Sequence, residues 1–126
     1  MSSSSPLLLL LLAVTMASAY YFIAPPTTPV EIVKHHMKYV VEAGDAENAT
    51  TFLQLIEFIN PAKTNVTLAM AVFSSYEYYP ITAEFFNHGH VYTRVDMKKP
   101  EREMYMYFML RPTTSSPSGW TIYNVT

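Results

Sequence analysis

The sequence predicts an α+β domain in which one N-terminal helix packs on a curved antiparallel β-sheet. One segment near residue 30 repeats its apolar side chains at helical spacing, and the second half of the chain alternates apolar and polar residues at strand spacing. Nothing between Val66 and Val125 has a helical pattern, so the crossover helices of a parallel sheet are not expected.

Residues 1–19 have the three-part pattern of a secretory signal peptide. A polar start precedes a leucine-rich run over 6–14, and Ala17-Ser18-Ala19 supplies the small residues that signal peptidase accepts. The apolar run is shorter than the roughly 20 residues that cross a bilayer. We therefore expect cleavage after Ala19, a secreted product without a membrane anchor, an extended arm over 20–27 and a single domain over 28–126.

The composition excludes several classes of function. The net charge is −2 and the charges are interspersed, so no basic surface for nucleic acid is expected. The chain has no cysteine, which excludes disulfides, thiolate metal sites and a cysteine nucleophile. Packing of ten tyrosines, seven phenylalanines and eight methionines must therefore hold the domain together.

A helix is predicted over 28–43. Thr28 can cap it, Pro29 suits the first helical position, and Glu31 completes a capping box. Gly44 stands where a left-handed residue commonly ends a helix. The apolar stripe of this helix consists of Val30, Val33, Met37, Val40 and Val41.

Two short apolar runs follow the helix. Residues 52–59 fit either a helix begun by Thr51 and Gln54 or a strand, and the crowding of β-branched and aromatic residues in a run of eight favours the strand. The run 68–73 begins the part of the chain that we expect to be β-rich.

The remaining strands are expected at 78–86, 90–97, 103–111 and 120–125. Pro80 suits an edge strand or a bulge, and Asn87-His88-Gly89 has the chemistry of a turn. One face of the second of these strands carries Val91, Thr93, Val95 and Met97. In the third, Met104, Met106, Phe108 and Leu110 face one way, and Tyr105, Tyr107 and Met109 face the other.

Three sequons are present, and two of them mark expected glycosylation sites: Asn48-Ala49-Thr50 and Asn65-Val66-Thr67. The third, Asn124-Val125-Thr126, is not expected to be used, because the transferase needs chain beyond the acceptor. A sequon in a secreted domain is expected in a solvent-exposed loop.

The order of a signal peptide, one helix and antiparallel strands resembles the cystatins and their cystatin-like relatives, particularly the plant type. The helix at Val30–Ala43 is similar to the cystatin helix, and 53–59 looks like the strand that leaves it. Residues 104–112 and 119–122 are similar to the last two cystatin strands. The resemblance covers most of the chain at the level of pattern, and it implies a cystatin-like fold and inhibition of papain-like cysteine proteases.

Cystatins bind such proteases through an N-terminal segment and two hairpin tips. The corresponding residues here are Tyr21 and Phe22, then Val72, Phe73, Ser74 and Ser75, then Pro112 and Trp120. The chain departs from the family pattern in three ways. It lacks a glycine before the helix, the Gln-x-Val-x-Gly sequence of the first hairpin, and an adjacent Pro-Trp pair in the second.

No catalytic residue, cofactor or metal site is predicted. His88 and His90 could share one face of an extended segment, but a turn with solvated histidines is favoured over metal ligation. The alternative function is a secreted, non-catalytic glycoprotein that binds a small apolar ligand or a partner protein. A helix laid on a curved sheet can enclose a pocket lined by methionine and aromatic residues, and Tyr105, Tyr107 and Met109 are of this kind.

Overall fold

The structure is a computed structural model that describes residues 26–126. The predicted signal peptide over 1–19, most of the arm over 20–27, and the proposed contacts Tyr21 and Phe22 lie outside the described residues. The elements follow in the order α2 (Pro29–Asp45), α3 (Ala49–Leu55), the 3₁₀ turn η2 (Pro61–Lys63), α4 (Val66–Ser74), β1 (Glu77–Phe86), β2 (His90–Lys99), β3 (Arg102–Pro112) and β4 (Trp120–Val125).

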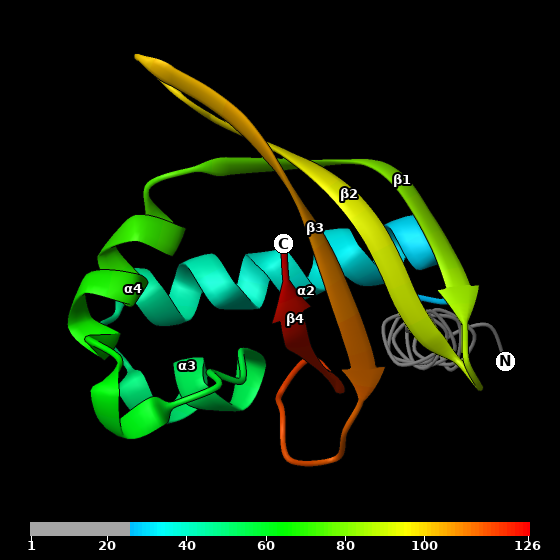
Figure 1. Cartoon of the computed structure of the whole chain (residues 1–126), viewed down its shortest axis with the longest axis horizontal. Helices are drawn as coiled ribbons and strands as arrows, with labels where there is room; N and C mark the ends of the chain where they lie inside the picture. Colours follow the sequence, from blue (N-terminus) through cyan, green and yellow to red (C-terminus); the bar gives the residue numbers. More distant parts are fainter. Residues whose placement is uncertain (1–25) are drawn as a thin grey trace, which may run out of the picture.

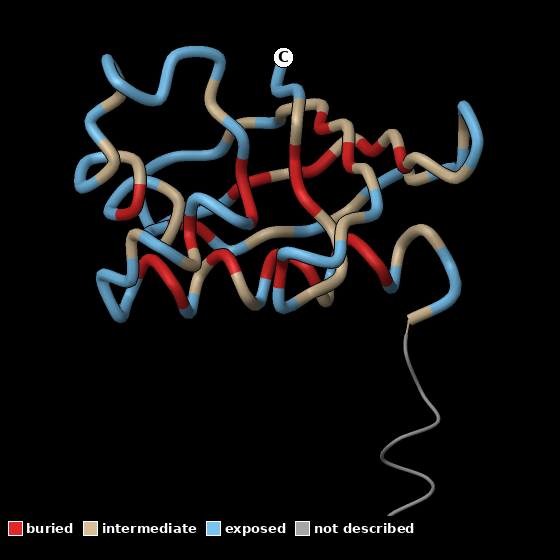
Figure 2. The backbone as a smooth tube through the Cα atoms, turned by 90° about the horizontal axis from the view of Figure 1, so that it is seen from below, coloured by how far each residue is buried: buried red, intermediate tan, exposed pale blue. Residues whose placement is uncertain are grey.

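The four strands form one antiparallel sheet in the order β1-β2-β3-β4, and the helices pack on one of its faces (Figure 1). The prediction of an α+β fold with a curved antiparallel sheet is therefore confirmed. Figure 2 shows the buried segments gathered between α2 and the sheet. The largest fully buried side chains come from α3, the residue after it, and the last two strands: Phe52, Leu55, Ile56, Phe108, Leu110 and Ile122.

The helix α2 begins as predicted and ends two residues later. The Thr28 hydroxyl accepts a hydrogen bond from the Glu31 N–H at 3.3 Å, and Pro29 occupies the first turn. Gly44 is buried inside the helix, and a Cβ there would lie 2.8 Å from the Met70 carbonyl oxygen. The expectation that Gly44 caps the helix is wrong, because α2 continues to Asp45 and Ala46 is its C-cap. Gly44 instead permits the close approach of α4.

The strands expected at 52–59 and 68–73 are wrong, as is the expectation that no helix follows Val66. Residues 52–55 belong to α3 and residues 68–73 belong to α4, while Ile56 forms an isolated parallel bridge with Ile122. The N-cap of each helix is the asparagine of a predicted glycosylation sequon. The Asn48 side chain accepts from the Thr51 N–H at 3.1 Å, and the Asn65 side chain accepts from the Leu68 N–H at 3.0 Å. These caps and the packing of both helices against α2 outweigh the strand propensity of short apolar runs.

The expected pattern of the sheet is confirmed. Pro80 lies in the edge strand β1, where the register shifts between Pro80 and Thr82. Asn87, His88 and Gly89 turn the chain with φ angles of 40°, 61° and 93°. On the helix side, β2 buries Val91, Thr93, Val95 and Met97, and β3 buries Phe108 and Leu110 with Met104 and Met106 partly covered.

Candidate functional site

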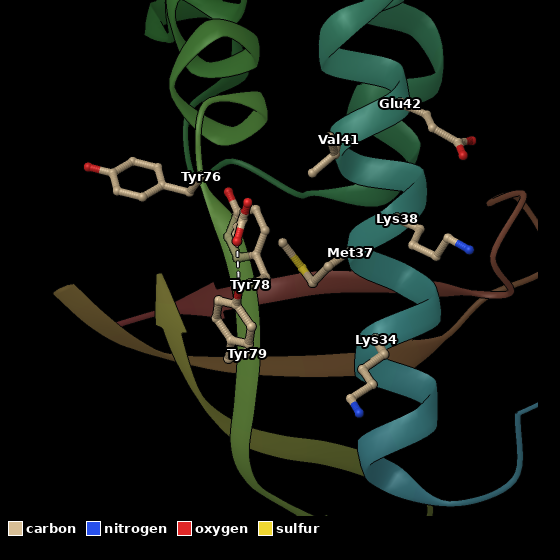
Figure 3. Close-up of a pocket in the computed structure, with 9 residues that line it drawn as sticks. Lys34, Met37, Lys38, Val41, Glu42, Tyr76, Tyr78 and Tyr79 are labelled. Atoms are coloured by element: carbon tan, nitrogen blue, oxygen red, sulfur yellow. Dashed lines mark hydrogen bonds between the residues drawn. The ribbon is translucent and has the colours of Figure 1, made fainter. Parts of the chain in front are cut away.

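An apolar groove of about 610 Å³ runs between α2 and β1 (Figure 3). We call it the α2–β1 groove. Its α2 side is lined by Lys34, Met37, Lys38, Val41 and Glu42, and its other side by Tyr76, Glu77, Tyr78 and Tyr79. It is bounded by a helix and by the unpaired edge of the sheet, since β1 has a neighbouring strand on only one side.

The helical repeat explains the α2 side of the groove. Residues three and four apart share one face of a helix, so Lys34, Met37 and Val41 form one row. In Figure 3, Met37 and Val41 point from α2 towards β1, while Lys38 and Glu42 point away from it. The floor is therefore apolar, and the charged groups lie at the rim.

Tyr78 and Tyr79 on the opposite side offer their rings and no free hydroxyl group, because both hydroxyls already have partners. The Tyr78 hydroxyl donates to the Phe73 carbonyl oxygen, and burial raises the pKa of Tyr78. The Tyr79 hydroxyl donates to the Glu77 carboxylate, and this hydrogen bond raises the pKa of Tyr79. Both phenols therefore stay neutral at physiological pH.

The α2–β1 groove is lined by methionine and tyrosine, but not by Tyr105, Tyr107 and Met109, the residues expected to line a pocket. Tyr105, Tyr107 and Met109 alternate with the core residues of β3 and lie on the face turned away from the helices. Two features of the sequence could have indicated this groove: the apolar row Met37 and Val41 on the helix, and the tyrosine-rich segment over 76–79.

A buried histidine and a serine meet at a second place. His36 is fully buried, and its Nδ1 lies 2.7 Å from the Ser118 hydroxyl, while its Nε2 lies 3.1 Å from the Leu55 carbonyl oxygen. A carbonyl only accepts, so Nε2 carries the proton and Nδ1 accepts from Ser118. Burial lowers the pKa of His36 to about 4. His36 falls between Val33 and Val40 on the buried stripe of α2, so the helical repeat turns it, and not the adjacent His35, into the core.

The contacts of the His36–Ser118 pair favour a structural role, in which the pair holds elements together, over nucleophilic catalysis. The serine hydroxyl also lies within hydrogen-bonding distance of Ser116 Oγ and of the Trp120 backbone nitrogen and oxygen. Both imidazole nitrogens are occupied, so no carboxylate orients the ring as in a catalytic triad. The pair connects α2, the end of α3 and the loop between β3 and β4.

The residues expected to contact a protease are placed as follows. Val72, Phe73 and Ser74 lie in α4 and Ser75 caps its end, so the hairpin expected at this position does not form there. Pro112 and Trp120 are cross-strand partners where β3 passes into β4. The structure therefore brings together Pro112 and Trp120, the residues of the second expected hairpin tip. It places the residues of the first expected tip, 72–75, in α4 and at its C-cap.

The two histidines considered as metal ligands do not act as a pair. His88 is exposed in the turn, whereas His90 Nδ1 lies 3.0 Å from the Tyr123 hydroxyl. Within residues 26–126, no group of three or more His, Asp or Glu side chains is placed to hold a metal ion. No helix in that same part of the chain has the length and apolarity needed to span a membrane.

Comparison with protein-family models, with curated proteins and with solved structures found no match to this chain. The likeness to cystatins therefore rests on the sequence pattern alone.

Proposed function

We propose that this protein acts by binding and that the α2–β1 groove holds a small apolar molecule. The groove itself is the observation that carries the proposal. Its volume of about 610 Å³ lies within the roughly 300–1,000 Å³ range of pockets that bind small molecules. Such pockets are mostly apolar with a few polar groups at their margins, and the α2–β1 groove has this composition.

The wall residues favour an apolar ligand over a polar one. Met37 can adjust its shape to a ligand because its thioether chain is unbranched and polarizable. The rings of Tyr78 and Tyr79 offer a large flat contact area, while their hydroxyls are held by Phe73 and Glu77. A polar ligand would lose its hydration in the groove and find few free partners there.

Binding of N-phenyl-1-naphthylamine, a neutral apolar fluorophore, tests the proposal. We expect saturable fluorescence enhancement with the wild-type protein. Val41→Glu should weaken binding at least about tenfold, since a carboxylate on the wall of the groove opposes an apolar ligand. The matched control is Val72→Glu, which places the same charge on an exposed position of α4. The proposal fails if the folded wild type shows no saturable signal, or if Val41→Glu binds as the wild type does.

Inhibition of papain-like cysteine proteases is a second candidate, favoured by the pairing of Pro112 and Trp120 at the β3–β4 connection. A protease inhibitor of the wedge type needs a rigid sheet that presents apolar tips, and it binds without chemistry. Titration of papain with the folded protein tests this candidate, and Trp120→Ala is expected to weaken inhibition. Full papain activity at micromolar concentrations of the protein would exclude it.

We also propose that the protein is secreted and glycosylated at Asn48 and Asn65. Both residues are exposed, and each uses its side-chain oxygen as a helix cap. A glycan is attached to the amide nitrogen, so the cap and the modification use different atoms of the same side chain. This compatibility supports both sites.

A further inference from the structure

The sheet face turned away from the helices carries stacked aromatic and charged side chains. Tyr92 and Tyr107 stack with ring centroids 5.7 Å apart and an angle of 14° between their planes. Tyr105 meets Tyr107 edge-on at 6.0 Å, and the Arg94 guanidinium carbon lies 4.3 Å from the centroid of the Tyr105 ring. We call Tyr92, Arg94, Asp96, Tyr105 and Tyr107 the aromatic face.

The aromatic contacts continue from the aromatic face to both outer strands. On β1, Phe86 contacts Tyr92 edge-on at 6.3 Å and His90 at 5.7 Å. On β4, Tyr123 contacts His90 at 5.4 Å, and the Arg111 guanidinium lies over the Tyr123 ring. The contacts therefore link rings of all four strands in the order Tyr105, Tyr107, Tyr92, Phe86, His90 and Tyr123. A chain of rings of this length suits an elongated ligand.

A hollow of about 210 Å³ lies at one end of this chain of rings. It is lined by Arg94, Asp96, Lys98, Glu103, Met104 and Tyr105. Tyr105 is 56% exposed although it is a large aromatic residue within strand β3. An exposed ring beside a polar hollow can stack on a ligand whose edges make hydrogen bonds.

Two buried polar atoms at the hollow lack hydrogen bonds within the described residues. Arg94 Nε and Asp96 Oδ1 lie 3.4 Å apart as an ion pair, but neither makes a hydrogen bond. Neither atom has accessible surface, so a ligand cannot reach this pair of atoms itself. The two side chains are 39% and 27% exposed, however, so a ligand hydroxyl can accept from the rest of the guanidinium and donate to the rest of the carboxylate.

The charges around the hollow select against ionic ligands. Arg94 and Lys98 are balanced by Asp96 and Glu103, so the site has no excess of either sign. A polyanion such as a nucleic acid would need a basic surface. A ligand with apolar ring faces and a rim of hydroxyl groups matches both the exposed ring and the paired charges.

We propose that the aromatic face binds a neutral oligosaccharide. One sugar ring stacks on Tyr105, and its hydroxyl groups bond to Arg94 and Asp96. Further sugar units follow the chain of rings towards Tyr92 and Tyr107. This site lies on the opposite face of the sheet from α2, so it is independent of the apolar ligand proposed for the α2–β1 groove.

Isothermal titration calorimetry with cellohexaose, xylohexaose and mannohexaose tests the proposal. We expect at least one of the three to bind, and Tyr105→Ala to weaken that binding at least about tenfold. Asp96→Asn should also weaken it, because the carboxylate is the hydroxyl acceptor. The matched control is Phe85→Ala, which removes an equally exposed aromatic ring from β1 at a position paired with the helix-facing Val91.

Three outcomes would overturn the proposal. The first is that none of the three hexasaccharides binds to the folded wild type. The second is that Tyr105→Ala binds as tightly as the wild type while keeping its circular dichroism spectrum. The third is that polygalacturonate binds as tightly as the hexasaccharides, because the balanced charges at the hollow should not attract a polyanion. Competition between a hexasaccharide and N-phenyl-1-naphthylamine would contradict two independent sites.

Discussion

The imidazole of His36 and the hydroxyl of Ser118 lie 2.7 Å apart, although 82 positions separate these residues in the sequence. The same ring reaches the Leu55 carbonyl oxygen at 3.1 Å. One neutral side chain thereby joins the long helix, the end of α3 and the last loop of the sheet. Its protonation would place an uncompensated charge in the core.

The first prediction is that acid destabilises the protein through His36. The unfolded chain takes up a proton near pH 6.5, whereas the pKa of His36 in the folded protein is about 4. The stabilisation is therefore complete above pH 6.5, is lost as the pH falls towards 4, and amounts to about 3 kcal/mol. Urea unfolding at pH 7, 5.5 and 4 measures it.

Two variants separate this effect from general acid denaturation. His36→Gln is expected to be less stable than the wild type at pH 7 and to lose most of the decline between pH 6.5 and 4. His88→Gln alters an exposed histidine and should keep the decline. An unchanged pH profile in His36→Gln would show that other groups cause the loss.

The second prediction concerns the close approach of α2 and α4. Alanine normally favours a helix over glycine by about 1 kcal/mol. Gly44→Ala should nevertheless destabilise the protein by about 1–3 kcal/mol, because the new Cβ would lie 2.8 Å from the Met70 carbonyl oxygen and 2.9 Å from Ser74 Cβ. Thermal unfolding measures the change, and Glu42→Ala on the exposed side of α2 is the control. A stabilised Gly44→Ala protein would contradict this packing.

The third prediction is that Asn48 stabilises α3 through its side-chain oxygen. In unglycosylated protein from a bacterial host, Asn48→Asp should retain the cap and keep nearly wild-type stability. Asn48→Ala removes the acceptor and should lower the free energy of unfolding by about 1 kcal/mol. Chemical denaturation compares the two variants, and equal stability would mean that the cap contributes little.

The fourth prediction is that Asn48 and Asn65 carry glycans in a eukaryotic secretory host. Thr50→Ala and Thr67→Ala each destroy one sequon without changing the capping asparagine, so each should remove one glycosidase-sensitive shift on a denaturing gel. The double variant should show none. A wild-type chain in the medium without any such shift would contradict glycosylation at both sites.

Some of the fold could be predicted because its signals are local. The start of α2 depends on Thr28, Pro29 and Glu31, which are neighbours in the chain. The buried and open faces of β2 and β3 follow from strict alternation along each strand. These patterns need no knowledge of what the rest of the chain does.

The helices α3 and α4 could not be distinguished from strands in this way. They have seven and nine residues, and a short apolar run has the same composition in either structure. A helix of this length is stabilised mainly by the elements that pack against it. The one local indication of these helices is that Asn48 and Asn65 can act as N-caps through their side-chain oxygens. The same asparagines also fit glycosylation sequons, which involve the amide nitrogen, so the sequence pattern alone does not reveal the caps.

The amino-acid sequence by itself determined the fold class, the start of the long helix and the two faces of the sheet, because capping and alternation act between near neighbours. Only the tertiary structure decided that α4 packs against Gly44, that the α2–β1 groove opens beside an edge strand, and that His36 meets Ser118. Those features join residues far apart in the chain, and no local pattern records which surfaces will meet.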